Sequence, residues 1–352
     1  LYGTLARLIM WDETRARLVR LTYLVCLGVV SSCSSPSEPY QVPDRPTPCL
    51  SGTALCAERV DLGSGLYLPI HSTHLLEHGH AAIKRVIVVV HGSGRNGNDY
   101  FERTIAPAAA MDLLEETLII APTFQTSEDG PSKDEPFWTS GGWKRGHLSS
   151  SSGPSPRVSS YTAIDRILEL VLDSERFPIL EQVTITGHSA GGQVTHRFAG
   201  TSRIENETAI PFRYVVANPS TYLYVGSERD SQAGFAIPNS AACADYDDWH
   251  YGLQDLNNYA TAVSRDSIKV QLVRRDVRIL IGSADSLNAS LDVTCGANMQ
   301  GRHRFERGQT LIRFMDAFDP GHGHQEVIVP GIGHSSTQMY MSEEGRSALF
   351  GS

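Results

Sequence analysis

The chain has 352 residues, of which 41% are hydrophobic and 20% are charged, a composition typical of a globular protein with a large core. Its length fits one large α/β domain or two smaller ones. The formal net charge is -9 and no run of Lys or Arg occurs, which argues against nucleic acid or an anionic membrane surface as the main partner.

The N-terminal segment has the pattern of an export signal. From Met10, three arginines precede an apolar stretch at 21–30, and small residues follow it. The apolar stretch is too short to span a bilayer, so we expect residues 1–33 to lie outside the fold. The end of the segment resembles a bacterial lipobox, in which Cys33 would be lipidated. The alternative is an ordinary cleaved signal peptide with an incidental cysteine. These readings predict a lipoprotein of the outer membrane or periplasm, or a secreted protein.

Residues 34–57 are predicted to form a Ser/Pro-rich tether that contains a local disulfide. If Cys26 and Cys33 belong to the signal, four cysteines remain, and an even number in an exported protein predicts two disulfides. Three pairings are possible, and the simplest joins Cys49 to Cys56 and Cys243 to Cys295. No cysteine or histidine pair has the spacing of a zinc site, so no metal is expected.

From residue 58 to residue 352, predicted strands and helices alternate. Continuous apolar runs indicate strands that are buried on both faces, and 3.6-residue periodicity indicates helices. In chain order we expect a strand pair at 58–62 and 65–71, a strand at 84–90, a helix at 101–114, strands at 117–122 and 182–186 with a helix at 161–172 between them, strands at 212–217 and 277–281, a helix at 308–318 and a last strand at 326–329. The fold class predicted is α/β, with a doubly wound, mostly parallel sheet whose reactive groups collect at the carboxyl ends of the strands.

Two long irregular segments, 124–160 and 218–276, interrupt this alternation. They are longer than plain connections, so we expect a small cap or long loops over the site. Aromatic residues in such segments either pack or contact substrate. The candidate pocket residues are Trp138, Trp143, His188 and Asn218.

A G-x-S-x-G motif at 187–191 is centred on Ser189. A predicted strand precedes it and a helical pattern follows, which is the context of a nucleophile elbow. Gly187 and Gly191 lack a Cβ, so strand and helix can approach closely enough for the sharp turn. Ser189 is therefore the predicted nucleophile.

A serine nucleophile needs a base and a group that orients the base. Asp285 follows the strand at 277–281, and His334 follows the strand at 326–329. His334 would take the proton of Ser189, and Asp285 would orient the imidazole and stabilise its charged form. Asp292, seven residues after Asp285, is the alternative acid.

Three further histidines compete with His334. His188 lies inside the elbow motif, while His322 and His324 precede the last strand and so lie at its wrong end. The His322 and His324 pair is interpreted as an exposed turn rather than a metal site, because no Cys or acidic partner lies at ligand spacing.

The developing oxyanion needs backbone donors. One is predicted to be the N–H of Ala190, which follows the nucleophile at a helix N-terminus. The other is expected in the glycine-rich loop after the strand at 84–90, from Ser93 or from Gly92.

The loop at 91–94, the elbow, Asp285 and His334 together resemble the α/β-hydrolase superfamily, whose triad runs in the order Ser, Asp, His. In general character the chain is loosely similar to the esterase and polyhydroxybutyrate-depolymerase-like branch. The resemblance covers roughly Val60 to the C-terminus. It implies a serine hydrolase that cleaves carboxylic esters through an acyl-enzyme, with an ester-containing small molecule or polymer as substrate.

Alternatives remain open within and beyond this class. The same triad serves an amidase, a peptidase or an acyltransferase, and an inactive α/β-hydrolase fold can act as a surface binding protein. No cofactor is expected, since neither a dinucleotide fingerprint nor a Walker loop occurs. A membrane is expected as a partner only through the N-terminal lipid.

Overall fold

The computed structural model describes residues 45–351, apart from residue 232. The predicted signal segment with Cys33, and the tether up to residue 44, lie outside the described residues. The described residues belong to one compact unit. No helix among the described residues has the length and apolarity to cross a membrane.

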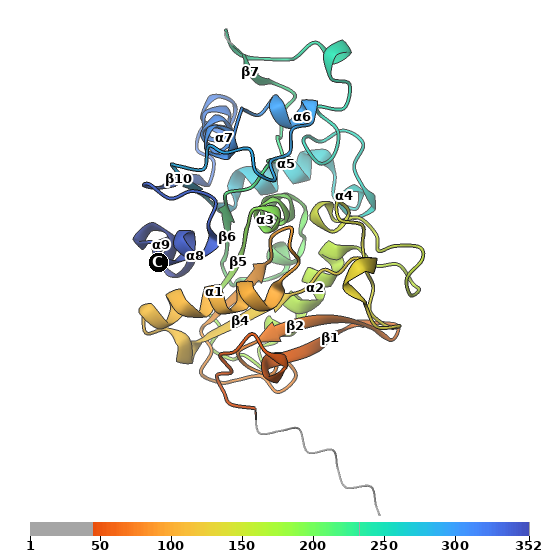
Figure 1. The fold of residues 1–352 in the computed structure, drawn as a ribbon, viewed down its shortest axis with the longest axis vertical. Coiled ribbons are helices and arrows are strands. Elements are labelled where there is room, and N and C mark those ends of the chain that lie inside the picture. Colours follow the sequence, from red (N-terminus) through yellow and green to blue (C-terminus); the bar gives the residue numbers. More distant parts are fainter. Residues whose placement is uncertain (1–44, 232, 352) are drawn as a thin grey trace, which may run out of the picture. The chain divides into compact units, whose positions relative to one another are not determined.

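An eight-stranded sheet forms the centre of this unit, in the order β1-β2-β4-β3-β5-β6-β9-β10 (Figure 1). β1 pairs antiparallel with β2 and β2 with β4, while all later pairs are parallel. This confirms the predicted doubly wound, mostly parallel sheet. The strands are β1 (Ala57–Gly63), β2 (Leu66–Ser72), β3 (Arg85–Val90), β4 (Thr117–Pro122), β5 (Gln182–His188), β6 (Phe212–Ala217), β9 (Asp276–Gly282) and β10 (His324–Val329).

The strand register brings the reactive loops to one edge of the sheet. Val90 pairs with Gly187, His188 pairs with Ala217, and Val329 pairs with Gly282. The carboxyl ends of β3, β5, β9 and β10 therefore align, although their residues are far apart in the sequence.

Helices cover both faces of the sheet. One hydrophobic cluster packs α1 (Gly97–Ala110), α8 (Ser336–Met341) and α9 (Glu343–Phe350) on one face. The other cluster packs α2 (Ser160–Val171), α3 (Ala190–Thr201), α5 (Arg265–Arg274) and α7 (Arg304–Phe318) on the opposite face. The short elements are α4 (Asn258–Thr261), α6 (Cys295–Asn298), the β7–β8 hairpin (Arg229–Ser231 and Gly234–Ala236) and 3₁₀ turns at Ala54–Cys56, Leu114–Glu116, Ser127–Asp129, Trp143–Arg145, Ile204–Glu207 and Ser240–Ala242.

Two helices begin earlier than the sequence pattern predicts. α1 begins at Gly97 rather than 101, and α7 begins at Arg304 rather than 308. In α7, the His303 side chain accepts a hydrogen bond from the Glu306 N–H and caps the helix. Gly308 then lies inside the helix, where a Cβ would come within 2.8 Å of Ile281. The glycine serves close packing on β9 and is not a helix boundary.

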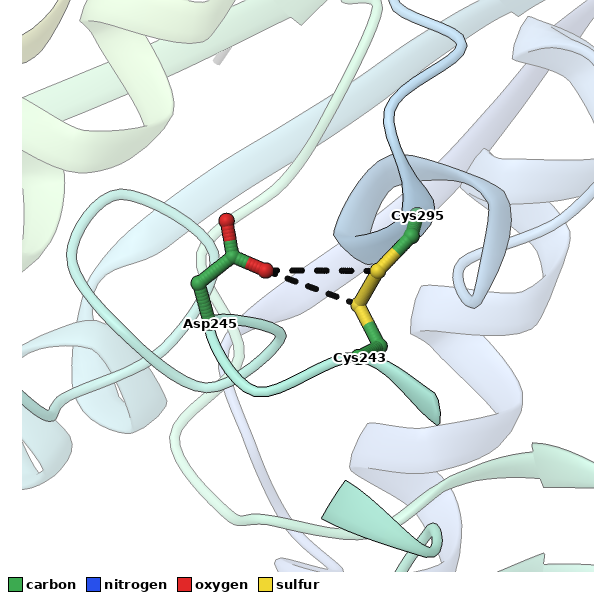
Figure 2. Close-up of side chains that lie close together, drawn as sticks. All are labelled: Cys243, Asp245 and Cys295. Carbon is green, nitrogen blue, oxygen red and sulfur yellow. Dashed lines mark hydrogen bonds between the residues drawn. A yellow bond between two sulfur atoms is a disulfide. The ribbon is translucent and has the colours of Figure 1, made fainter. Parts of the chain in front are cut away.

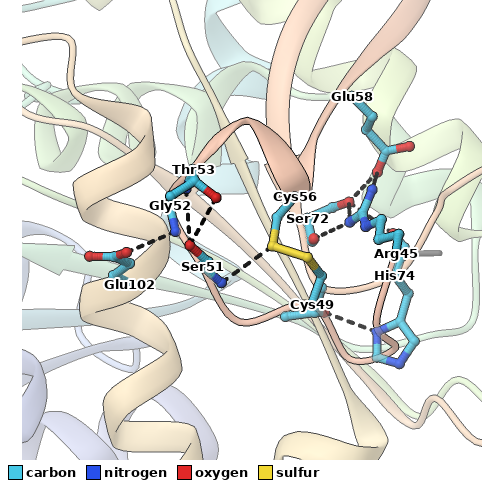
Figure 3. Close-up of a disulfide and its surroundings, with 11 residues drawn as sticks. Arg45, Cys49, Ser51, Gly52, Thr53, Cys56, Glu58, Ser72, His74 and Glu102 are labelled. Carbon is cyan, nitrogen blue, oxygen red and sulfur yellow. Dashed lines mark hydrogen bonds and ion pairs between the residues drawn. A yellow bond between two sulfur atoms is a disulfide. The ribbon is translucent and has the colours of Figure 1, made fainter. Parts of the chain in front are cut away.

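The described part of the predicted tether, residues 45–57, packs on the domain (Figure 3). Cys49 and Cys56 form a disulfide and are fully buried against α1. The Cys49 N–H donates to the carbonyl of Thr73, and Arg45 pairs with Glu58. The folded unit thus begins before the predicted boundary at residue 58, because the disulfide folds this segment back onto the sheet.

The second disulfide joins Cys243 to Cys295, so both predicted pairings are present. It links the irregular segment 218–276 to α6 across 52 residues (Figure 2). This segment and the loop after β9 are therefore tied together.

Candidate active site

Ser189 lies at a strained turn between β5 and α3. Its φ and ψ are 59° and -115°, an unfavourable combination for a residue with a side chain. A Cβ on Gly191 would lie 2.0 Å from the carbonyl oxygen of Val90, and a Cβ on Gly187 would lie 2.4 Å from Gly191. Only glycine fits at both positions. The Ser189 hydroxyl does not cap α3, which leaves it free for other contacts.

His334 and Asp285 form a hydrogen-bonded pair at the ends of neighbouring strands. His334 Nδ1 lies 2.7 Å from Asp285 Oδ2, and the Asp285 side chain is almost completely buried. A carboxylate only accepts, so Nδ1 carries the proton and Nε2 is left to act as a base. A Cβ on Gly282 would come within 2.3 Å of the Ile332 carbonyl, so the two loops touch at a glycine.

Ser189 and His334 line the same cavity, which has a volume of about 430 Å³. No hydrogen bond joins the Ser189 hydroxyl to His334 in the described part of the chain. Catalytic hydrogen bonds are often long in unliganded enzymes and shorten when substrate binds. The other lining residues are Gly92, Ser93, Gly94, Asn96, Tyr100, Arg103, His188, Ser290, Ser335, Ser336 and Thr337.

Two of the three predicted oxyanion donors, Gly92 and Ser93, line this cavity. Ala190 is not among the lining residues, but it follows Ser189 at the start of α3, where the first N–H groups have no partner within the helix. The buried His91 braces the loop, because its Nδ1 bonds the Gly92 carbonyl at 2.8 Å and its Nε2 accepts the Phe124 N–H at 2.9 Å. Burial lowers the pKa of His91 to about 4, so the ring is neutral at pH 7.

His188 and Asn218 contact the loops that carry Asp285 and His334. The His188 ring lies 4.4 Å from the His334 ring, and burial together with His334 holds its pKa well below the ordinary value. A neutral His188 adds no positive charge beside His334. Asn218 is fully buried and does not line the cavity. It accepts the Gly282 N–H and donates to the Gly333 carbonyl, so it joins the loops after β9 and β10.

Trp138 and Trp143 do not line the cavity around Ser189, contrary to the expectation from the sequence. Both are buried in the core. Trp143 packs on the His91 ring at 4.6 Å, and the indole N–H of Trp138 donates to the carbonyls of His147 and Val158. The long segment 124–160 therefore packs against the loop at 91–94 through Trp143 and His91.

Arg304 is a site residue that the sequence pattern did not reveal. Its fully buried guanidinium lies 3.6 Å from Asp285 Oδ1 and donates to the carbonyls of Ala289 and Ser290. It thereby holds Asp285 and a loop whose residue Ser290 lines the cavity. A lone arginine at a helix start gives no signal in a single sequence, because its partners are defined only by the fold.

Arg103, Tyr100 and Ser336 are further cavity residues that were not predicted. Ser335, Ser336 and Thr337 directly follow His334, and this proximity in the chain could have identified them. Arg103 lies on α1, whose approach to α8 depends on tertiary packing alone.

His324 is buried at the start of β10, so the prediction of an exposed turn is wrong at this residue. Its Nε2 lies 3.4 Å from Nε2 of His196 on α3. Burial lowers the pKa of His324 to about 3 and that of His196 well below its ordinary value. This pair lies at the amino end of β10 and belongs to the packing of α3.

One group of metal-ligand atoms occurs among the described residues, formed by Cys243, Asp245 and Cys295 (Figure 2). The Asp245 carboxylate lies 3.6 and 3.9 Å from the two sulfur atoms. The two sulfur atoms are joined in a disulfide. A cysteine binds metal as a thiolate, so neither sulfur is a metal ligand in this form. The oxidised chain therefore offers a single carboxylate ligand at this position.

Neither a family model nor a curated protein matches the sequence. Solved structures do match the fold. A poly(3-hydroxybutyrate) depolymerase from Bordetella parapertussis is 25% identical with a TM-score of 0.59, over 84% of this chain and 89% of that one. Poly(aspartic acid) hydrolase-1 from Sphingomonas sp. KT-1 is 23% identical with a TM-score of 0.58, over 84% of this chain and 98% of that one.

The sheet order, the strained serine turn and these structural neighbours agree with one another. Strand order, helices on both faces and reactive loops at the carboxyl ends are those of a doubly wound hydrolase domain. The chain therefore has the α/β-hydrolase fold and is similar to the esterase-like hydrolases that share it.

Proposed function

We propose that the protein is an exported serine hydrolase that cleaves carboxylic esters through a Ser189, His334 and Asp285 triad and an acyl-enzyme intermediate. The single observation that carries the proposal is the Asp285–His334 hydrogen bond at the cavity that Ser189 also lines. The proposal is also supported by the chain order of the three residues, which follow three separate strands in the order of an α/β-hydrolase triad.

In the first step, Ser189 Oγ attacks the acyl carbon and its proton moves to His334 Nε2. The carbonyl oxygen becomes an oxyanion that backbone N–H groups of Ala190 and of Ser93 or Gly92 would stabilise. The intermediate then collapses, the alcohol leaves with the proton from His334, and the acyl group stays on Ser189. Water repeats the sequence and releases the acid. Asp285 keeps the imidazole in the required tautomer throughout.

The cavity supports a small polar acyl group over a long chain. Its lining holds no aliphatic side chain, and its volume of about 430 Å³ suits a compact substrate. The matching depolymerase acts on a polyester of short hydroxy acids. We therefore propose short hydroxyacyl esters, free or at the end of a polymer, as the substrates of this chain.

The export part of the proposal is supported by two observations. The pattern at 10–33 is that of a signal segment, and two disulfides are formed in the described domain. Disulfides persist in oxidising compartments. Lipidation of Cys33 would anchor the enzyme at a membrane, and cleavage without lipidation would release it.

The test replaces Ser189 by alanine and follows the hydrolysis of short 4-nitrophenyl esters. Ser189→Ala should reduce kcat by about a thousandfold or more, because the nucleophile is removed. The exposed Ser151→Ala is the matched control and should keep the wild-type rate. Unchanged hydrolysis by Ser189→Ala would reject the proposal. A parallel set of anilides separates an esterase from an amidase.

A further inference from the structure

Among the residues that the structure describes, Arg103 is the only permanently charged one in the lining of the catalytic cavity. The thirteen lining residues are otherwise glycines, hydroxyl-bearing side chains, Asn96 and two histidines, of which His188 is neutral. The chain as a whole carries a net charge of -9. The charge of Arg103 is therefore opposite in sign to the net charge of the protein. This favours a specific role of Arg103 in binding an anionic ligand over a general attraction of anions by the whole protein.

Neighbouring residues hold the Arg103 guanidinium in place at the junction of α1 and α8. One terminal nitrogen donates to Ser336 Oγ at 3.1 Å, and the other donates to Asp99 Oδ2 at 3.2 Å. The guanidinium also lies 5.1 Å from the centre of the Tyr100 ring. These contacts fix the side chain before any ligand binds, which lowers the entropy cost of binding.

The contacts leave most of the donors of Arg103 free. A guanidinium has five N–H groups, and two of them bond protein partners within the described residues. The Asp99 pair is monodentate, and the same carboxylate oxygen also accepts from Asn96 at 2.6 Å. Asp99 therefore neutralises Arg103 only in part. The side chain is 31% exposed, so a ligand in the cavity can reach it.

The other nearby charges do not compete for Arg103. Asp285 is buried and bonded to His334, with Arg304 on its second oxygen. A free carboxylate on the substrate would thus meet Arg103 as its strongest partner in the cavity, through charge-assisted hydrogen bonds.

We propose that Arg103 binds a carboxylate that the substrate carries in addition to the scissile ester, so that monoanionic esters are the preferred substrate class. The inference rests on the proposed ester hydrolysis and names its substrates more narrowly. The carboxylate can belong to the acyl part, as in a dicarboxylic monoester, or to the alcohol part, as in the free-acid end of a hydroxy-acid oligomer.

Two matched pairs of esters test the proposal and separate these sources. In the first pair, mono(4-nitrophenyl) glutarate has a carboxylate on the acyl part that its methyl ester lacks. In the second pair, 4-acetoxybenzoate has a carboxylate on the leaving alcohol that its methyl ester lacks. In wild type, kcat/KM should favour the anion in at least one pair. Arg103→Gln should lower that anion-to-neutral ratio by about tenfold or more, since a charge-assisted hydrogen bond is lost. Arg103→Lys should retain part of the ratio.

The control is Arg166→Gln, which removes an exposed arginine on α2 and should keep the wild-type ratio. An equal ratio in wild type and Arg103→Gln for both pairs would overturn the proposal. A second measurement does not depend on turnover. Calorimetry compares the binding of mono(4-nitrophenyl) glutarate and of its methyl ester to the Ser189→Ala variant. Arg103-dependent binding without any hydrolysis by the wild type would reject the ester hydrolase function and retain the carboxylate site.

Discussion

Asp285 and Asp292 lie seven residues apart, and the structure gives their carboxylates different surroundings. Asp285 Oδ2 bonds His334 at 2.7 Å. Asp292 instead accepts from Tyr251 at 2.8 Å and from Thr294. These contacts favour Asp285 over Asp292 as the acid of the proposed triad.

Asp285→Asn should lower kcat by about a thousandfold or more, because the amide stabilises the wrong tautomer of His334 and no longer balances its positive charge. Asp292→Asn changes the alternative acid in the same way and should keep kcat within about threefold of the wild-type value. Steady-state hydrolysis of a 4-nitrophenyl ester at pH 7 measures both. A larger loss of kcat in Asp292→Asn than in Asp285→Asn would assign the acid to the other residue.

Residues with a local signature were predictable, and residues defined by packing were not. Ser189, Asp285 and His334 each follow a predicted strand, so their common edge could be inferred. Trp143 looked like a pocket wall because composition alone does not tell a loop that covers a cavity from one that packs behind it. Arg304 and Arg103 reach the site from helices far away in the chain.

At the scale of elements, the pairing of His196 with His324 joins α3 to the first residue of β10. His196 Nδ1 accepts the Leu223 N–H, so its Nε2 carries the proton and donates to His324 Nε2. His324 Nδ1 has no hydrogen-bond partner within the described residues. Protonation of either ring would place a charge in the core.

The folded-state pKa of both histidines lies below the unfolded value of about 6.5, so the unfolded chain binds more protons in acid. The contribution of each to stability is complete above pH 6.5 and falls as the pH falls, and that of His324 is lost as the pH falls toward about 3. His324→Gln keeps an acceptor for His196 and removes one titrating ring. Between pH 7 and pH 4.5 the variant should therefore lose less free energy of unfolding than wild type in urea denaturation.

The exposed His78→Gln is the control and should follow wild type at both pH values. An equal loss of unfolding free energy in His324→Gln and wild type would show that the buried pair does not carry the acid sensitivity.

The strands of the main sheet and the helices α1, α2, α3 and α7 followed from the sequence, because buried parallel strands have long apolar runs and these helices have clear periodicity. The helices α5, α8 and α9 were not predicted, and α5 lies in a segment that was expected to be irregular. The boundaries of the elements did not follow from the sequence. α7 contains Gly308, which the sequence pattern placed at a helix start, and β5 runs on through Gly187 to His188. In both places glycine serves close packing, which is a tertiary demand.

On the scale of the whole molecule, two disulfides constrain the chain over very different lengths. The Cys49–Cys56 bond spans 7 residues and fastens the N-terminal segment, whereas the Cys243–Cys295 bond spans 52 and ties two segments beside the site. Loop-closure entropy grows with the number of residues enclosed, so the longer bridge should stabilise the fold more.

Variants with one bridge each test this expectation. The double variant Cys49→Ala/Cys56→Ala keeps only the long bridge. Reduction of this variant opens that bridge and should lower the free energy of unfolding by about 4 kcal/mol. The double variant Cys243→Ala/Cys295→Ala keeps only the short bridge, and its reduction should lower the free energy of unfolding by about 2 kcal/mol. Urea denaturation of each variant, oxidised and reduced, isolates the bridge from the effect of the substitutions. An equal or reversed order would contradict the entropic account.

The central claim is that Ser189 is an activated nucleophile, and covalent labelling tests it most directly. The folded protein is treated with a fluorophosphonate, digested and mapped by mass spectrometry. The account predicts one adduct, on the peptide that contains Ser189, with none in Ser189→Ala and slower labelling in Asp285→Asn. Absence of an adduct on folded wild-type protein, or an adduct on a different serine, would contradict it.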